Sequence, residues 1–143
     1  MSKPTYDDVN LILRLYEIRR EEKLRAARNW FVANFKCKTL DEFNKLCPPG
    51  SEPNAMARQV TSYWEMVASF ITAGVLNEEL FFQNTRELLL AYLRVQPLLG
   101  EIRAAFKDPS YMKNLETVGK SYEEYLNRTG PEIVKAFKAR VGG

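Results

Sequence analysis

The stretch that most constrains the fold runs from Asn54 to Leu80, where one apolar helical stripe ends at a glycine. Its large apolar side chains recur at intervals of three and four residues, which predicts a helix that buries one face. They are Met56, Val60, Tyr63, Trp64, Val67, Phe70 and Ile71. We expect Asn54 to cap the start of this helix and Gly74 to end it, with Val75 in contact with the last turn. Asn77 is then expected to cap a second helix that packs back on the first as an αα-hairpin.

A long helix is also predicted near the N-terminus, from Thr5 to about Phe35. Good helix formers fill this span, and no glycine or proline interrupts it. Thr5 and Asp8 have the spacing of a capping box, which favours a helix start at this point. One apolar stripe follows the predicted helix and is expected to face the core. It consists of Val9, Leu13, Tyr16, Leu24, Ala27, Phe31 and Phe35.

The first four turns of this predicted helix carry a second apolar face. Leu11, Leu15 and Ile18 lie opposite the stripe, and a helix that is apolar on two sides needs a partner on each. The second partner is either another part of the fold or a second subunit. We take these three residues as the candidate interface of a homodimer.

Arg20 falls inside the apolar stripe of the same helix. Its guanidinium either reaches out to solvent or is buried against a carboxylate, for which Glu65 is the candidate. The other basic residues of the helix are spread around its circumference and mixed with glutamates. A helix that reads nucleic acid carries its cations on one face, so nucleic acid is not an expected partner.

Capping residues and breakers divide the remaining sequence into further helices. Thr39 is expected to cap a short helix over residues 40–46, and the segment CPPGSEPN that follows is expected to be a rigid loop. The helix that begins after Asn77 should kink near residues 94–96, because Pro97 removes one amide and clashes with the preceding turn.

The C-terminal part of the chain predicts two more helices. Asp108 and Pro109 have the pattern of an N-cap and a first helical residue. Gly119 lies within that helix and would allow a close helix crossing, and a last helix follows Pro131. The sequence therefore predicts an all-α, single-domain antiparallel helix bundle over residues 1–143. We expect about five to six helices, including a long N-terminal helix and a Pro-kinked central helix.

The sequence contains no constellation that is specific for a reaction. Histidine is absent, and no phosphate-binding, nucleophile-elbow or metal-binding motif is present. Cys37 and Cys47 are too few for a disulfide framework, and without a secretory signal we expect reduced thiols in a cytoplasmic protein. No apolar segment reaches the ~20 residues of a membrane span. We expect no enzymatic activity, no cofactor and no metal.

Part of the sequence resembles a group of uncharacterised bacterial helical domains. These domains carry a Tyr-Trp-Glu pattern, a Gly-x-Leu-Asn or Gly-x-Leu-Asp turn, and then acidic residues with an aromatic. The resemblance covers residues 14–95 and includes the runs RAARNWFVANF and SYWEMVASFITAGVLNEELFF. Its motif residues are Tyr63, Trp64, Glu65, Gly74, Leu76 and Asn77. The resemblance implies an all-helical fold and a bacterial, cytosolic protein, and it implies no activity.

Two functions remain as hypotheses. The first is a non-enzymatic helical interaction or scaffold module that acts as a homodimer, with an unidentified protein partner as a further possibility. The alternative is a bundle that binds a small molecule or lipid in an aromatic pocket between helices. The residues of that candidate pocket are Trp30, Tyr63, Trp64, Phe70 and Tyr92.

Overall fold

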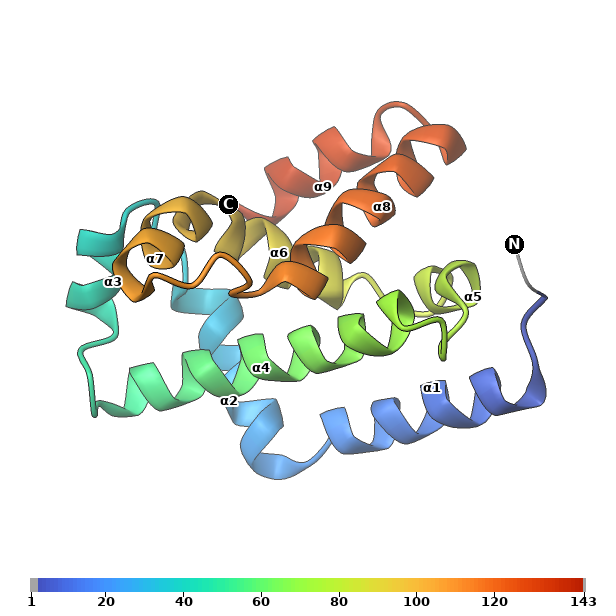
Figure 1. Cartoon of the computed structure of the whole chain (residues 1–143), viewed down its shortest axis with the longest axis horizontal. Helices are drawn as coiled ribbons and strands as arrows, with labels where there is room; N and C mark the ends of the chain where they lie inside the picture. Colours follow the sequence, from blue (N-terminus) through green and yellow to red (C-terminus); the bar gives the residue numbers. More distant parts are fainter. Residues whose placement is uncertain (1–2, 143) are drawn as a thin grey trace.

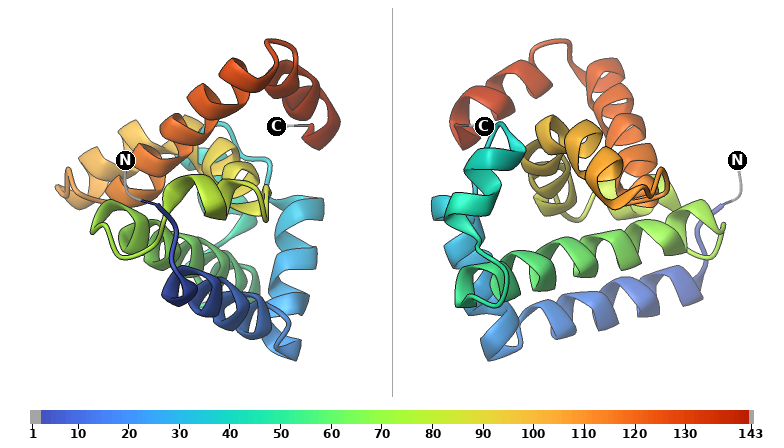
Figure 2. Two further views of the ribbon diagram at one scale, coloured as in Figure 1. Left: turned by 90° about the vertical axis from the view of Figure 1, so that its right-hand side faces the viewer. Right: turned by 60° about the vertical axis from the view of Figure 1, so that its left-hand side comes forward.

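The computed structural model describes residues 3–142, which form nine α-helices, one 3-10 turn and no strand. The helices are α1 (Tyr6–Arg19), α2 (Glu22–Asn34), α3 (Leu40–Leu46), α4 (Glu52–Thr72), α5 (Glu78–Phe82), α6 (Glu87–Val95), α7 (Leu99–Phe106), α8 (Lys113–Thr129) and α9 (Ile133–Val141). Helix α4 is central and packs mainly against α2 and α8, while α6 also packs on α8. Helix α1 runs beside α4 at one edge of the molecule (Figures 1 and 2). The expected all-α, single-domain fold is confirmed.

The central helix α4 begins three residues earlier than expected. Ser51 is its N-cap, and the Ser51 hydroxyl accepts a hydrogen bond from the Asn54 amide at 3.3 Å. Pro53 lies in the first turn, where its missing amide hydrogen costs nothing. The prediction that Asn54 caps the helix is therefore wrong. The Asn54 side chain instead donates to the Cys47 carbonyl at 3.0 Å and fixes the preceding loop.

The glycine stop at the end of α4 is confirmed. Gly74 has φ +78°, and the amides of Gly74 and Val75 donate to the carbonyls of Ile71 and Phe70, which is the Schellman pattern. The expected contact of Val75 with the last turn is not made, because Val75 is exposed. Leu76 is buried in its place.

The predicted long N-terminal helix is broken between α1 and α2. Arg20 is the last residue of this segment with a helical backbone conformation. The Glu21 carboxylate then accepts hydrogen bonds from the amides of Lys23 and Leu24 at 2.6 and 3.2 Å. Glu21 thus acts as the N-cap of α2 without any glycine or proline. Because the break resets the helical phase, the apolar stripe of α1 does not continue that of α2. The expectation of one helix over residues 5–35 is wrong for this reason.

The second predicted long helix is also divided. Asn77 caps α5 as expected, and its side chain accepts from the Leu80 amide at 2.9 Å, but α5 is one short turn and α6 begins only at Glu87. Helix α4 packs chiefly on α2 and α8 rather than forming an αα-hairpin with α5. Pro97 lies in the 3-10 turn Gln96–Leu98 that separates α6 from α7.

The start of α8 depends on a side chain from the central helix. Asp108 does not cap α8; its carboxylate accepts from the Ser110 amide and hydroxyl, and α8 begins only at Lys113. The N-terminal turn of α8 is capped by Glu65, which accepts from the Leu115 amide and the Asn114 side chain, both at 2.8 Å. A carboxylate at this end of a helix also interacts favourably with the helix dipole.

Asp8 joins the start of α1 to the turn between α4 and α5. Its carboxylate accepts from the Thr5 amide at 2.7 Å and from the Asn77 amide at 2.8 Å, and Asp8 and Thr5 form the expected capping box. The hydrogen bonds from Thr5 and then from Asn77 lower the pKa of Asp8. A carboxyl group whose pKa is lower in the folded state stabilises the fold above its unfolded pKa, and this stabilisation is lost as the pH falls through the folded value.

We therefore expect Asp8→Asn to be less stable than the unmodified protein at pH 7, and the difference to shrink as the pH falls from about 5 to 2. Urea unfolding at several pH values measures this. Asp7→Asn is the control, because Asp7 is an exposed neighbour in the same turn. A stability difference for Asp8→Asn that is the same at all pH values would contradict the assignment.

Candidate functional site

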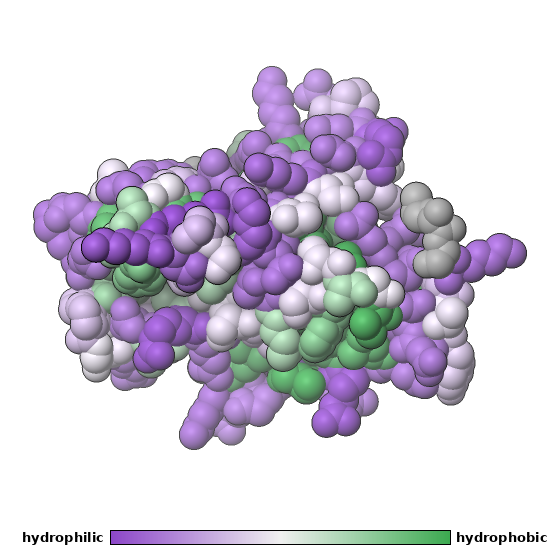
Figure 3. Space-filling view, in the orientation of Figure 1, coloured by the Kyte–Doolittle hydropathy of each residue, from purple (hydrophilic) through white to green (hydrophobic). Residues whose placement is uncertain are grey.

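The most unusual surface of the protein is the outer face of α1. Tyr6, Val9, Leu13 and Tyr16 are 78%, 42%, 54% and 48% exposed. Their separations of 3, 4 and 3 residues place them within about 80° of one another around the helix. We call these four residues the α1 stripe. Figure 3 shows hydrophobic side chains at the edge of the molecule where α1 lies. Contiguous apolar surface of this kind marks interaction sites more often than scattered apolar residues do.

Helix α1 is held in place by contacts on its opposite face. Leu15 is buried, and its carbonyl accepts a hydrogen bond from the Tyr63 hydroxyl of α4 at 2.6 Å. Near the C-terminal end of α1, Arg19 donates to Glu87 at 2.9 Å. Together with Asp8 at the N-terminal end, these contacts fix the rotation of α1. Tyr6, Val9 and Leu13 are consequently held outward, while Tyr16 is half exposed and also borders the small cavity between α1, α4 and α5.

The structure assigns the two apolar faces of α1 the other way round from the sequence prediction. Of the candidate interface residues, Leu15 is buried and Leu11 is partly buried against the core, so neither is available as an exposed contact. Ile18 is 38% exposed but lies outside the α1 stripe. The interface prediction is therefore wrong for Leu11 and Leu15. The helix is apolar on two sides as expected, but the break at Glu21 exchanges the inner and outer faces.

The predicted buried ion pair between Arg20 and Glu65 is not formed. Arg20 is exposed, and its guanidinium lies over the Tyr16 ring, 5.6 Å from the ring centroid. Glu65 is engaged at the start of α8 instead. The prediction carried the helical phase of α2 back to residue 20, and that phase does not apply in α1.

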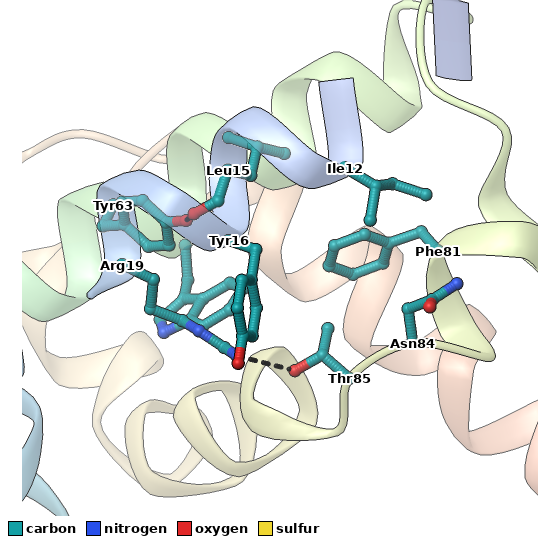
Figure 4. Close-up of a pocket in the computed structure, with 9 residues that line it drawn as sticks. Ile12, Leu15, Tyr16, Arg19, Tyr63, Phe81, Asn84 and Thr85 are labelled. Carbon is teal, nitrogen blue, oxygen red and sulfur yellow. Dashed lines mark hydrogen bonds between the residues drawn. The ribbon is translucent and has the colours of Figure 1, made fainter. Parts of the chain in front are cut away.

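The predicted aromatic residues do not form one pocket. Tyr63 and Trp64 line a small cavity between α1, α4 and α5, together with Leu15, Phe81 and others (Figure 4). Trp30 and Phe70 are partly buried elsewhere against the core, and Tyr92 packs against α8. The cavity measures about 30 Å³, enough for one or two water molecules and far below the volume of a lipid or drug-sized ligand.

Buried and partly buried arginines are the polar feature that the sequence prediction missed. Glu87 accepts from Arg19 at 2.9 Å and from Arg28 at 2.7 Å, which links α1, α2 and α6. Arg94 is 3% exposed and donates to the carbonyls of Phe31, Val32 and Phe35 and to that of Val141. It thus caps the C-terminal ends of α2 and α9 at once. Arg94 lies within an apolar run at the end of α6, which is the one sequence signal for its burial.

Burial moves the pKa values of several core side chains away from neutral pH. Burial raises the pKa of Tyr63 to about 12 and that of Cys47 to about 11. Cys37 is also a buried free thiol with a raised pKa, caused first by burial and then by Glu42. Within residues 3–142, His, Cys, Asp and Glu side chains form no group of three or more that could hold a metal ion. Over the same residues, no helix combines the length and the apolar character needed to cross a membrane.

Comparison with known protein families gives a match that covers most of the chain. The model of a family described as a domain of unknown function, DUF4760, matches residues 4–122. The chain belongs to this family. The DUF4760 match begins before α1 and ends within α8, so the α1 stripe and the central helix α4 both lie inside it. Comparisons with curated proteins and with solved structures give no match.

Proposed function

We propose that this DUF4760 protein is a non-enzymatic interaction module that forms a homodimer through the α1 stripe. The observation that carries the proposal is the row of four large apolar side chains, each at least 42% exposed, at heptad spacing along α1. A side chain as large as Tyr6 is seldom left mostly exposed in such a row without a partner. The cavity beside Trp64 supports the alternative of a lipid-binding bundle poorly, because it is too small for that ligand.

The pattern of the stripe favours an antiparallel arrangement of the two α1 helices. The order Tyr, aliphatic, aliphatic, Tyr with separations of 3, 4 and 3 residues reads the same in both directions. In an antiparallel pair related by a two-fold axis, Tyr6 faces Tyr16 of the second copy and Val9 faces Leu13 of the second copy. A two-fold interface requires a self-complementary surface of this kind. The two helix dipoles are also antiparallel in this arrangement, which is electrostatically favourable.

Charges on one side of α1 favour the same arrangement. Asp7, Arg14 and Glu17 are exposed on this side of the helix. None of them is in an ion pair within residues 3–142. Reversing the direction of the second helix places Asp7 of one copy level with Arg14 of the other, on the same side of the pair. Such pairs at an exposed rim select orientation more than they add affinity.

The length of α1 sets the expected strength of the dimer. A helix of 14 residues is about 20 Å long, and a pair of such helices covers less than the ~800 Å² per partner of a typical stable complex. We therefore expect weak association, with a Kd on the order of 10–100 µM.

We also propose a bacterial, cytoplasmic location, which the two free thiols Cys37 and Cys47 support because such thiols are usual in a reducing compartment.

Aspartate substitutions on the two sides of α1 test the proposed surface. Leu13→Asp is expected to weaken dimerisation at least about tenfold, since it places a charge in the middle of the stripe. Ile18→Asp is the matched control on the same helix and is expected to dimerise like the unmodified chain. Sedimentation equilibrium measures both. If Ile18→Asp abolished dimerisation and Leu13→Asp did not, the surface would be wrong.

Paired charge variants test the direction of the helices. The double variant Tyr6→Glu/Tyr16→Lys places opposite charges across an antiparallel interface, whereas Tyr6→Glu/Tyr16→Glu places like charges there. We expect the first variant to dimerise about three- to tenfold more tightly than the second. In a parallel pair each residue faces the same residue of the second copy. Both variants would then place like charges opposite each other and would dimerise equally weakly. That result would reject the antiparallel arrangement and leave the surface in place.

A further inference from the structure

A wide groove lies on a different part of the molecule from α1. It encloses about 910 Å³ between the α3–α4 loop, the first half of α4 and the segment that joins α7 to α8. Figure 3 shows it as a hollow with hydrophobic side chains on its floor, on the side where α3 and α7 lie in Figure 1. The volume is at the upper end of the range for small-molecule sites. No residue of the α1 stripe lines it.

One wall of the groove is aromatic and apolar. Phe106 and Tyr111 meet edge to face with ring centroids 5.8 Å apart, and Met112 lies beside them. Phe106 is 62% exposed although it ends α7 in a well-packed fold. Phe43 of α3 lines the opposite part of the groove. These side chains form a partly exposed apolar surface. An apolar group of a ligand would remove this surface from water on binding.

The backbone of this wall is held in an uncommon conformation. Lys107 and Met112 have φ of +53° and +54°, and they are the two non-glycine residues with positive φ in the part of the chain that the structure describes. At Lys107 this conformation belongs to the Schellman cap that ends α7. At Met112, which precedes α8, it is unfavourable for a residue with a side chain, and such residues are common at ligand sites. The segment between these two residues contains Tyr111, which lines the groove.

A single charge lines the groove. Arg58 is the one charged side chain among the lining residues, and it has no carboxylate partner within residues 3–142. Its Nε donates to the Asn54 side chain at 2.9 Å, which orients the guanidinium along α4 and leaves its remaining donors for another acceptor. A guanidinium binds a carboxylate or sulfonate through paired hydrogen bonds.

We propose that this groove binds a small amphiphilic organic anion. The apolar part of the ligand, an aromatic or branched aliphatic group, packs on Phe106, Tyr111 and Met112. The acidic group, a carboxylate or sulfonate, pairs with Arg58. The site is independent of the proposed dimer, because the two surfaces share no residue.

Two fluorescent probes test this site on the full chain. 8-Anilinonaphthalene-1-sulfonate is an amphiphilic anion, and N-phenyl-1-naphthylamine is the same apolar framework without the acidic group. Arg58→Gln is expected to weaken binding of the anionic probe about tenfold and that of the neutral probe less than about twofold. Phe106→Ser is expected to weaken both. 1-Naphthoate, an aromatic carboxylate, is expected to displace the anionic probe from the unmodified protein.

Matched controls separate this site from the rest of the surface. Arg25→Gln removes an exposed arginine from α2, and Leu13→Asp disrupts the α1 stripe; both are expected to bind the anionic probe like the unmodified chain. Circular dichroism of each variant establishes that it is folded. The proposal is overturned if Arg58→Gln and Arg25→Gln bind the anionic probe equally, or if the unmodified protein shows no saturable binding.

Discussion

Replacement of Arg94 by methionine is expected to lower the free energy of unfolding by about 2–3 kcal/mol. Arg94 is 3% exposed and donates to carbonyls of Phe31, Val32 and Phe35 at 2.9–3.2 Å and to the Val141 carbonyl at 2.7 Å. Methionine fills a similar volume but has no donor, so the last carbonyls of α2 and α9 would be left unsatisfied. Urea unfolding followed by circular dichroism measures the loss.

Two further variants show whether this loss comes from the cap. Arg94→Lys keeps the charge but not the forked donors, and its loss of stability is expected to be intermediate. Arg25→Met removes an exposed arginine from α2 and is expected to change the free energy of unfolding by less than about 0.5 kcal/mol. The capping role would be rejected if Arg94→Met proved as stable as Arg25→Met.

Substitution of Gly119 by alanine is expected to lower the free energy of unfolding by about 2–4 kcal/mol, although alanine is the better helix former. A Cβ atom at this position in α8 would lie 2.3 Å from Cγ and 2.8 Å from Cβ of Tyr92. These atoms are next to the α6 backbone, so the tyrosine cannot swing away without moving its helix. The close crossing of α6 and α8 therefore requires glycine.

Gly100 provides the matched control for this substitution. It also lies within a helix, α7, but a Cβ atom there would meet nothing within 4 Å. We expect Gly100→Ala to be neutral or to stabilise the protein by up to about 1 kcal/mol. Equal effects of the two substitutions in thermal or urea unfolding would show that α6 and α8 do not cross as closely as described.

The elements that sequence reasoning places correctly are those with local signals. The short helix α3 begins after its Thr39 cap and has the predicted bounds, Leu40–Leu46. Gly74 ends α4 and Asn77 caps α5, because a left-handed residue and a side-chain cap depend on neighbouring residues alone. The expected close crossing at Gly119 is also present, since a glycine within a strong helical pattern is conspicuous.

The elements that sequence reasoning misplaces depend on contacts between distant segments. The break after α1 has no glycine or proline; it rests on the Glu21 cap and on Arg28, which donates to the Arg19 carbonyl at 3.3 Å. The sequence pattern does not show this break, so it predicts that the helical phase of α2 continues through α1, which places both the interface residues and Arg20 on the wrong face of the helix. Glu65 belongs to α4 but caps α8, and no local pattern reveals such a partner.

The central claim is that the α1 stripe pairs with a second copy of itself, and the solution mass of the unmodified chain tests it most directly. We would measure that mass by light scattering from about 5 to 500 µM, a range that spans the expected Kd. The account predicts a mass that rises from 16.6 kDa towards twice this value as the concentration increases. A mass that stays at 16.6 kDa over the whole range would contradict it.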